Sequence, residues 1–156
     1  MSRAVSSVGP IERFMVDDHA RLDRLLAAAS QHDQVELALY ALFRADLLRH
    51  IAMEEKVLLP FARAKRAGEP LEVARALRDD HGVIAKLLLR TPTPALVDEL
   101  RAILGQHNSL EEGPSGLYAQ CDELAGAESA DLVQRLRAEP TVPVAPHDNG
   151  PLHSRH

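Results

Sequence analysis

One order of histidine and glutamate residues occurs twice along this chain, at spacings typical of helices. The first half carries a histidine that follows two aspartates and then a His-x-x-x-Glu motif, and the second half repeats this order. An internal repeat of this kind constrains the fold before any single residue does. It predicts two similar helical halves whose six repeated side chains are His19, His50, Glu54, His81, His107 and Glu111.

Apolar residues recur at helical spacing through four long segments. These segments are about 10–29, about 34–67, about 70–90, and a fourth that begins near Pro94 and is interrupted soon after Glu111 by Gly113-Pro114. Pro60 lies inside the second segment and is expected to kink it or to end its regular part. Aromatic residues make up only 3% of the chain, and a composition rich in alanine, leucine, arginine and glutamate favours helix over strand.

Four amphipathic helices joined by short turns predict an all-α fold, an up-down-up-down four-helix bundle. A shorter helix over about 128–138 is expected to follow the bundle. Residues 1–9 are expected to form a flexible arm, and the proline-rich residues 139–156 a disordered tail, because neither shows apolar periodicity. The predicted organisation is one domain, residues 10–138, between two irregular ends.

The six repeated side chains all fall on the apolar stripes of the predicted helices. A histidine and a glutamate four residues apart lie one turn apart on the same helix face. One inward histidine, taken alone, is usually a core residue with a satisfied nitrogen. Two carboxylates buried in a bundle core without a countercharge would cost several kcal/mol. Metal ions would supply that charge, so the set favours a metal site over a purely structural role.

The number of donor atoms suits two metal ions. Four imidazoles divide as two per ion, while Glu54 and Glu111 can each give one oxygen to each ion. A solvent-derived oxo or hydroxo bridge would make five ligands per ion and leave each ion one open position. Imidazole and carboxylate without thiolate suit iron best, with manganese second, and suit structural zinc less well. Ferritin-like centres use Glu-x-x-His, whereas both motifs here have the reverse order and a longer spacing.

The order of these ligands, together with Glu55-Lys-Val-Leu-Leu-Pro60 after the first motif, resembles the haemerythrin-like family, the HHE cation-binding domain, over about residues 11–120. The resemblance implies a non-haem di-iron centre in which Glu54 and Glu111 bridge the two irons. It implies that one iron is served by His19 and His50, and the other by His81 and His107.

The resemblance also has one informative departure. Oxygen-carrying haemerythrins have a fifth histidine one turn from the ligand on the third helix, and the corresponding places here are Leu77 and Ala85. The chain is therefore similar to the four-histidine, two-glutamate branch of the family. That branch includes di-iron proteins of oxidative and nitrosative stress and of iron–sulfur repair.

These patterns predict a protein that binds or turns over a small oxidant: peroxide, nitric oxide or dioxygen. Catalase-like or nitric-oxide-reactive catalysis is open; the alternative is a non-enzymatic module for oxygen or iron sensing or storage, or an iron donor for iron–sulfur repair. A net charge of −5 without a basic run argues against nucleic acid. The single cysteine, Cys121, and the lack of a membrane-length apolar run or signal peptide predict a cytoplasmic protein without membrane contact.

A few further side chains are candidates for supporting roles. Asp18 and Asp80 could orient imidazoles on neighbouring helices, with a solvated surface acid as the alternative. Glu55 and Glu112 follow the ligating glutamates, point about 100° away from them on a regular helix and are expected to be exposed. Tyr118 could reach the site, although packing in the core or at the surface is the favoured interpretation.

Overall fold

The computed structural model describes residues 8–150, and within them every regular element is a helix. A π-helical turn, Glu54–Leu58, joins α2 to α3, and a 3₁₀ turn, Gly126–Glu128, joins α6 to α7. No strand occurs in this part of the chain, so the predicted all-α class is confirmed. The helices are α1 (Pro10–Ala29), α2 (Leu37–Met53), α3 (Leu59–Lys65), α4 (Ala74–Leu89), α5 (Pro94–Glu111), α6 (Leu117–Ala125) and α7 (Ser129–Arg137).

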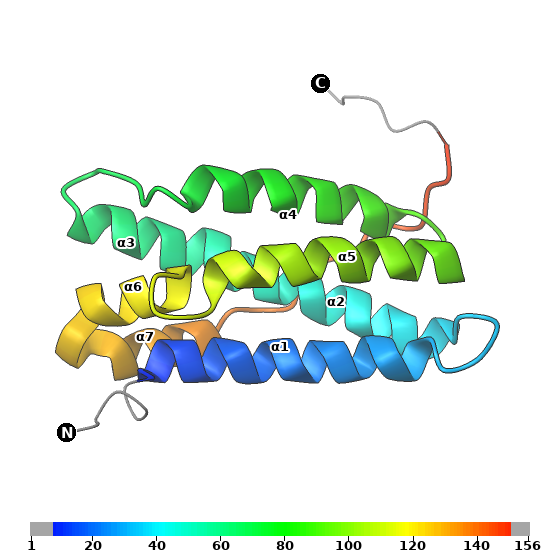
Figure 1. Cartoon of the computed structure of the whole chain (residues 1–156), viewed down its shortest axis with the longest axis horizontal. Coiled ribbons are helices and arrows are strands. Elements are labelled where there is room, and N and C mark those ends of the chain that lie inside the picture. The colour runs from blue at the N-terminus through cyan, green and yellow to red at the C-terminus, as the bar shows by residue number, and fades with distance from the viewer. Residues whose placement is uncertain (1–7, 151–156) are drawn as a thin grey trace.

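The long helices lie side by side along the longest axis of the molecule (Figure 1). Helix α1 packs against α2, and α4 packs against α5. The short helices α6 and α7 both contact α1, and Figure 1 shows them beside its N-terminal half. Because α6 also packs against α3 and α5, it brings a late segment of the chain to the interior of the bundle.

The second predicted helix is not regular along its whole length. The N–H of Leu59 bonds to the carbonyl of Glu54, five residues earlier, which is the hydrogen-bond pattern of a π turn. Pro60 lacks an N–H, and in a regular α-helix its ring would clash with the carbonyl of Lys56. The wider turn relieves this clash. The regular α-helix is interrupted just before Pro60 and resumes as α3, which contains the proline in its first turn. The π turn contains Glu54 and Glu55.

Two helix assignments differ from the sequence expectation. Helix α4 begins at Ala74 rather than near Pro70. Helix α6 was not predicted as a separate element, because Gly113-Pro114 obscures the periodicity around it. The connection into α6 depends on Gly116, where an added Cβ would lie 2.4 Å from the carbonyl oxygen of Glu111. No larger residue fits there without moving the end of α5 away from α6.

The buried apolar residues form two clusters, and the histidines fall between them along the helices. On α1, His19 lies between Met15 of the first cluster and Leu22 of the second. On α4, His81 lies between Leu77 and Ile84 in the same way. The two clusters therefore hold a polar layer in the middle of the bundle. Burial of apolar surface on both sides keeps that layer in place.

Residues 139–150 form no helix but are attached to the helices by hydrogen bonds. The Arg49 guanidinium donates to the carbonyl of Glu139 at 2.7 Å, and the Arg44 guanidinium donates to the carbonyl of Ala145. The N–H of Asp148 donates to the carbonyl of Leu89 at 2.7 Å. The described part of the predicted disordered tail therefore has defined contacts. Residues 151–156, and residues 1–7 of the predicted arm, lie outside the described residues.

Candidate metal centre

The structure brings all six repeated side chains into one interior cluster. Glu54 and Glu111 are completely buried, and three of the histidines are at most 5% exposed. The side chain of His19 is 9% exposed. The set comes from four different helices and the π turn: α1 gives His19, α2 gives His50, the π turn gives Glu54, α4 gives His81, and α5 gives His107 and Glu111.

The donor atoms of the cluster form two groups of four that share both glutamates. Within each group the candidate ligand atoms lie within 4.8 Å of one another. This division matches the pairing of histidines that the resemblance implied. The first group is His19, His50, Glu54 and Glu111, and the second is Glu54, His81, His107 and Glu111.

The Glu54 carboxylate faces one histidine of each pair with a different oxygen. Its Oε2 lies 3.1 Å from Nε2 of His50, and its Oε1 lies 2.9 Å from Nε2 of His81. A carboxylate that gives one oxygen to each of two cations presents its oxygens in this divided way. The π turn supports the arrangement, because it sets the direction in which Glu54 leaves the backbone.

Glu111 is divided between the two pairs in the same manner. Its Oε1 lies 3.0 Å from Nε2 of His19, and its Oε2 lies 2.9 Å from Nε2 of His107. Although Oε2 is close to that ring nitrogen and fully buried, no hydrogen bond of suitable direction reaches it from the described part of the chain. A buried carboxylate oxygen without a hydrogen bond is costly. A cation between the oxygen and the ring nitrogen would satisfy both atoms, so the residues present fit a metal ion.

Two aspartates form hydrogen-bond contacts with the Nδ1 atoms of two histidines. Asp18 of α1 places Oδ2 2.7 Å from Nδ1 of His50 on α2, and Asp80 of α4 places Oδ2 3.0 Å from Nδ1 of His107 on α5. The expectation that these aspartates orient imidazoles on neighbouring helices is confirmed. With Nδ1 carrying the proton toward the carboxylate, Nε2 presents its lone pair to the cluster.

Two glutamates do the same for the other histidines, and the expectation that they are simply exposed was wrong. Glu55 Oε2 lies 2.6 Å from Nδ1 of His81, and Glu112 Oε2 lies 2.5 Å from Nδ1 of His19. Their side chains are 33% and 38% exposed. The regular-helix argument failed because Glu55 lies in the π turn and Glu112 has extended backbone at the end of α5, with φ −95° and ψ 161°.

Without a cation, the cluster balances its carboxylates by protonating imidazoles. Burial lowers the pKa of His50, but the Glu54 carboxylate and the hydrogen bond to Asp18 outweigh it and raise this pKa to about 10. Burial likewise opposes protonation of His107, whose pKa the Glu111 and Glu54 carboxylates raise to about 11. Burial raises the pKa of Glu54, yet the surrounding imidazoles hold it well below its usual value. Metal ions would displace these imidazole protons.

Tyr118 of α6 packs in the first apolar cluster, as the favoured interpretation expected, but its hydroxyl also reaches the histidines and glutamates. It is fully buried. Its Oη lies 2.5 Å from Oε2 of Glu54 and 2.9 Å from Oε1 of Glu111. The same oxygen lies 3.0 Å from Nε2 of His19 and 3.2 Å from Nε2 of His50. Burial, followed by the two carboxylate charges, raises the pKa of Tyr118 well above 10.

Contacts to α1 fix the position of α6 and hence of Tyr118. The Asp122 carboxylate accepts hydrogen bonds from the N–H groups of Ile11 and Glu12, each at 2.9 Å, and so caps the first turn of α1. The Glu12 carboxylate in turn accepts a hydrogen bond at 2.9 Å from the N–H of Gly113, in the loop before α6. Sequence spacing could not reveal these contacts, because each joins segments about a hundred residues apart.

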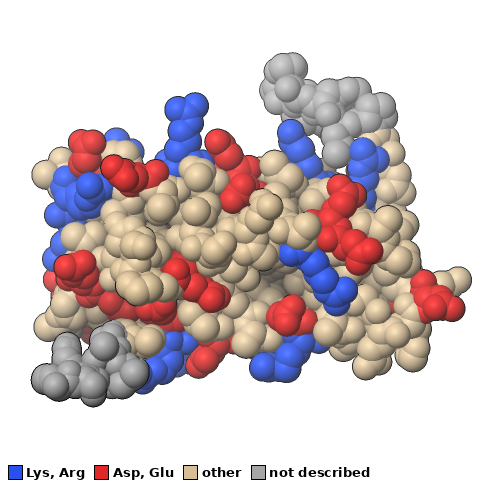
Figure 2. All heavy atoms as spheres, viewed as in Figure 1, with Lys and Arg blue, Asp and Glu red and all other residues tan. Residues whose placement is uncertain are grey.

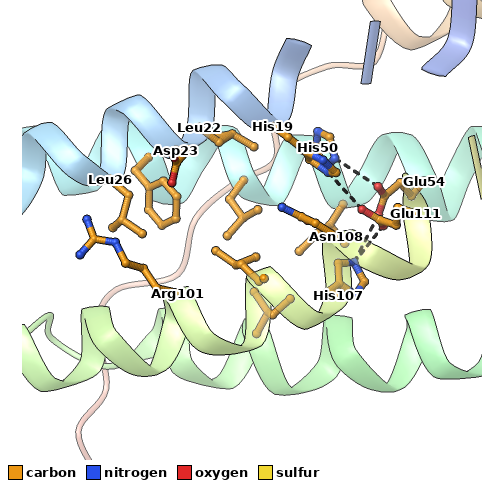
Figure 3. A pocket seen from close by; sticks show the side chains of 16 residues that line it. His19, Leu22, Asp23, Leu26, His50, Glu54, Arg101, His107, Asn108 and Glu111 are labelled. Carbon is orange, nitrogen blue, oxygen red and sulfur yellow. Dashed lines mark ion pairs between the residues drawn. The ribbon is translucent and has the colours of Figure 1, made fainter. Parts of the chain in front are cut away.

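A cavity of about 200 Å³ leads to one side of the cluster (Figure 3). Its walls are mainly apolar side chains from α1, α2, α4 and α5, among them Leu26 and Phe43. The cluster forms its inner end, and Figure 3 shows Arg101 and Asp23 away from the ion pairs. Tyr118 is not part of the lining. A small molecule could therefore reach the cluster through largely apolar surroundings without passing Tyr118.

Charged side chains of both signs are mixed on the face of the molecule seen in Figure 2. None of the helices in residues 8–150 combines the length and apolar character needed to cross a bilayer. Lysine and arginine side chains are interspersed with aspartate and glutamate on this face (Figure 2).

Comparison with known families agrees with the ligand pattern. The family model of the hemerythrin HHE cation binding domain matches residues 11–139, a span that runs from the start of α1 past the end of α7 and includes every member of the cluster. No curated protein and no solved structure matches the chain. Since the family model covers most of the chain, this protein belongs to the hemerythrin HHE cation-binding domain family.

Proposed function

We propose that the cluster holds a binuclear non-haem iron centre that binds or turns over a small oxidant. Peroxide, nitric oxide and dioxygen are the candidate ligands, and oxidative or nitrosative stress is the setting. The proposal includes an up-down-up-down arrangement of the four long helices and a cytoplasmic location. The observation that carries it is the division of Glu54 and Glu111, each of which turns one oxygen to each histidine pair.

The donor set favours two iron ions over one ion or over zinc. A single ion cannot use all six side chains, because each histidine pair has its own position around the shared carboxylates. Neutral imidazoles and carboxylates suit iron and manganese, whereas structural zinc sites are usually tetrahedral and rich in thiolate. Cys121 is buried, and its Sγ contacts the carbonyl of Leu58, so it belongs to the apolar core and not to the cluster.

The residues around the cluster support reactivity with a small molecule. Bound iron would supply Lewis-acid and redox chemistry. Four carboxylates contact the Nδ1 atoms of the four histidines and fix the direction of each imidazole; they belong to Asp18, Glu55, Asp80 and Glu112. The apolar walls of the cavity limit the water that reaches the inner end. A cavity of this size admits peroxide or a diatomic gas to the side chains of His107 and Glu111.

Metal analysis and an optical spectrum of the purified protein test this proposal, before and after addition of peroxide and nitric oxide. We expect about two irons per chain and a spectrum that both reagents change. Glu111→Gln should lower the iron content sharply, because it removes the charge of one shared carboxylate. Glu99→Gln, an exposed position on the same helix, is the matched control and should leave the iron content unchanged.

Three outcomes would overturn parts of the proposal. Protein that contains neither iron nor manganese and cannot be loaded with them would remove the metal centre. Loaded protein that ignores peroxide and nitric oxide, yet binds and releases dioxygen cleanly, would favour the non-enzymatic alternative of sensing or carriage. Loss of iron to an apo iron–sulfur protein under the same conditions would instead favour an iron donor.

A further inference from the structure

The hydroxyl of Tyr118 has more close polar neighbours than a phenol can satisfy with hydrogen bonds. Four polar atoms lie within 3.2 Å of its Oη: one acceptor oxygen from each shared glutamate, and Nε2 of His19 and of His50. A phenol has a single proton to donate. These four residues are the first candidate metal group, whereas Tyr118 makes no such set of contacts with His81 and His107.

The distances around Tyr118 match those between neighbouring ligands of one octahedral ion. For ligands about 2.1 Å from a metal ion, adjacent ligand atoms are about 3.0 Å apart. The phenol oxygen lies 2.5, 2.9, 3.0 and 3.2 Å from its four neighbours. Nε2 of His19 lies 3.0 Å from Oε1 of Glu111, and Nε2 of His50 lies 3.1 Å from Oε2 of Glu54. An octahedral vertex has four adjacent ligands, which is the number found here.

We propose that Tyr118 is a seventh protein ligand and binds, as a phenolate, the metal ion held by His19 and His50. On binding, the phenol O–H bond breaks, its proton leaves to water, and the oxygen bonds to the metal ion. A bound cation favours this form, because its charge reverses the local preference for the neutral phenol. This inference rests on the proposed metal centre and adds a residue that the histidine–glutamate motifs do not contain.

The seventh ligand makes the two metal positions unequal. With the two shared glutamates and a solvent bridge, the position at His19, His50 and Tyr118 has six ligands and is full. The position at His81 and His107 has five ligands and keeps one open place. Sequence alone predicted an open place on both ions. The cavity is lined by His19 and His50 as well as by His107, so it reaches both positions. With Tyr118 bound at the first position, a small molecule entering the cavity would find an open place only at the second.

The two tyrosines of the chain allow a clean spectroscopic test. Tyr40, the second one, is also buried, but it lies in the other apolar cluster, and its hydroxyl has no hydrogen-bond partner among residues 8–150. Iron(III)-loaded wild-type protein and the Tyr40→Phe control should show a visible phenolate-to-iron charge-transfer band. Resonance Raman excitation in that band should enhance phenolate ring vibrations. Tyr118→Phe should lose both the band and the vibrations.

The experiment remains decisive even if Tyr118→Phe does not fold. Growth with ring-deuterated tyrosine should shift the enhanced vibrations of the wild-type protein, and the same vibrations in Tyr40→Phe can come only from Tyr118. Wild-type protein that holds two irons but shows no phenolate vibrations would overturn this inference and leave the proposed function intact. A phenolate band that persists in folded Tyr118→Phe would overturn it as well. Protein that cannot be loaded with iron would refute both proposals.

Discussion

Replacing Asp80 by asparagine should weaken metal binding without disturbing the fold. Asp80 contacts Nδ1 of His107 at 3.0 Å, and among the described residues it has no ion pair with a lysine or arginine. Asparagine has nearly the same shape and can still accept the Nδ1 hydrogen bond. The substitution therefore removes the negative charge that makes the His107 imidazole a stronger ligand.

The expected loss is about tenfold in metal affinity, or about 1.4 kcal/mol. Removal of a carboxylate behind a ligating histidine typically costs about 10- to 100-fold. The Asp80 side chain is 30% exposed, so water screens part of its charge and the lower end of that range applies. Asp18 is only 11% exposed and lies 2.7 Å from His50. Asp18→Asn should therefore fall nearer the upper end, about 100-fold.

Anaerobic competition for iron(II) against a coloured chelator measures this affinity, and circular dichroism checks the fold of each variant. Asp79→Asn and Asp17→Asn are the matched controls, because each is an exposed neighbour on the same helix. Both controls should bind iron as the wild-type protein does. The reasoning is refuted if Asp80→Asn binds iron as tightly as Asp79→Asn, or if Asp18→Asn loses less affinity than Asp80→Asn.

Three further predictions concern pH, the C-terminal segment and the cysteine. In metal-free protein, the pKa values of His50 and His107 are raised to about 10 and about 11. Protonation of these two imidazoles therefore stabilises the folded state; this contribution is complete below about pH 6.5 and is lost toward pH 10–11. The apo melting temperature should fall over that range, and the gain on metal loading should increase; parallel curves would contradict this. Deleting residues 140–156 removes the acceptor of the Arg44 guanidinium at Ala145 and should cost about 1.5–3 kcal/mol, visible in chemical denaturation, with iron content unchanged. Burial, then Asp122 and Glu54, raises the pKa of Cys121 to about 12, so a thiol reagent at pH 8 should label it only after unfolding; rapid labelling of native protein would show that the core opens.

The sequence by itself determined the all-helical class, the four long helical segments and the six repeated side chains. Helical periodicity relates residues three and four apart, so each His-x-x-x-Glu pair and its apolar neighbours could be assigned to one helix face. The predicted effect of Pro60 has the same basis, because a missing N–H acts on its own helix. The family could also be identified at this level, since its motifs are local and occur in a fixed order.

Only the tertiary structure decided what surrounds those six side chains. Glu55 and Glu112 reach histidines because the backbone leaves regular α-helix geometry where each of them occurs, in the π turn and at the end of α5. Tyr118 reaches the cluster because Asp122 and Gly116 fix a short helix against α1 and α5. Local periodicity carries no information about contacts between distant segments. Such contacts depend on how the helices pack, and they are what makes the two candidate metal positions different.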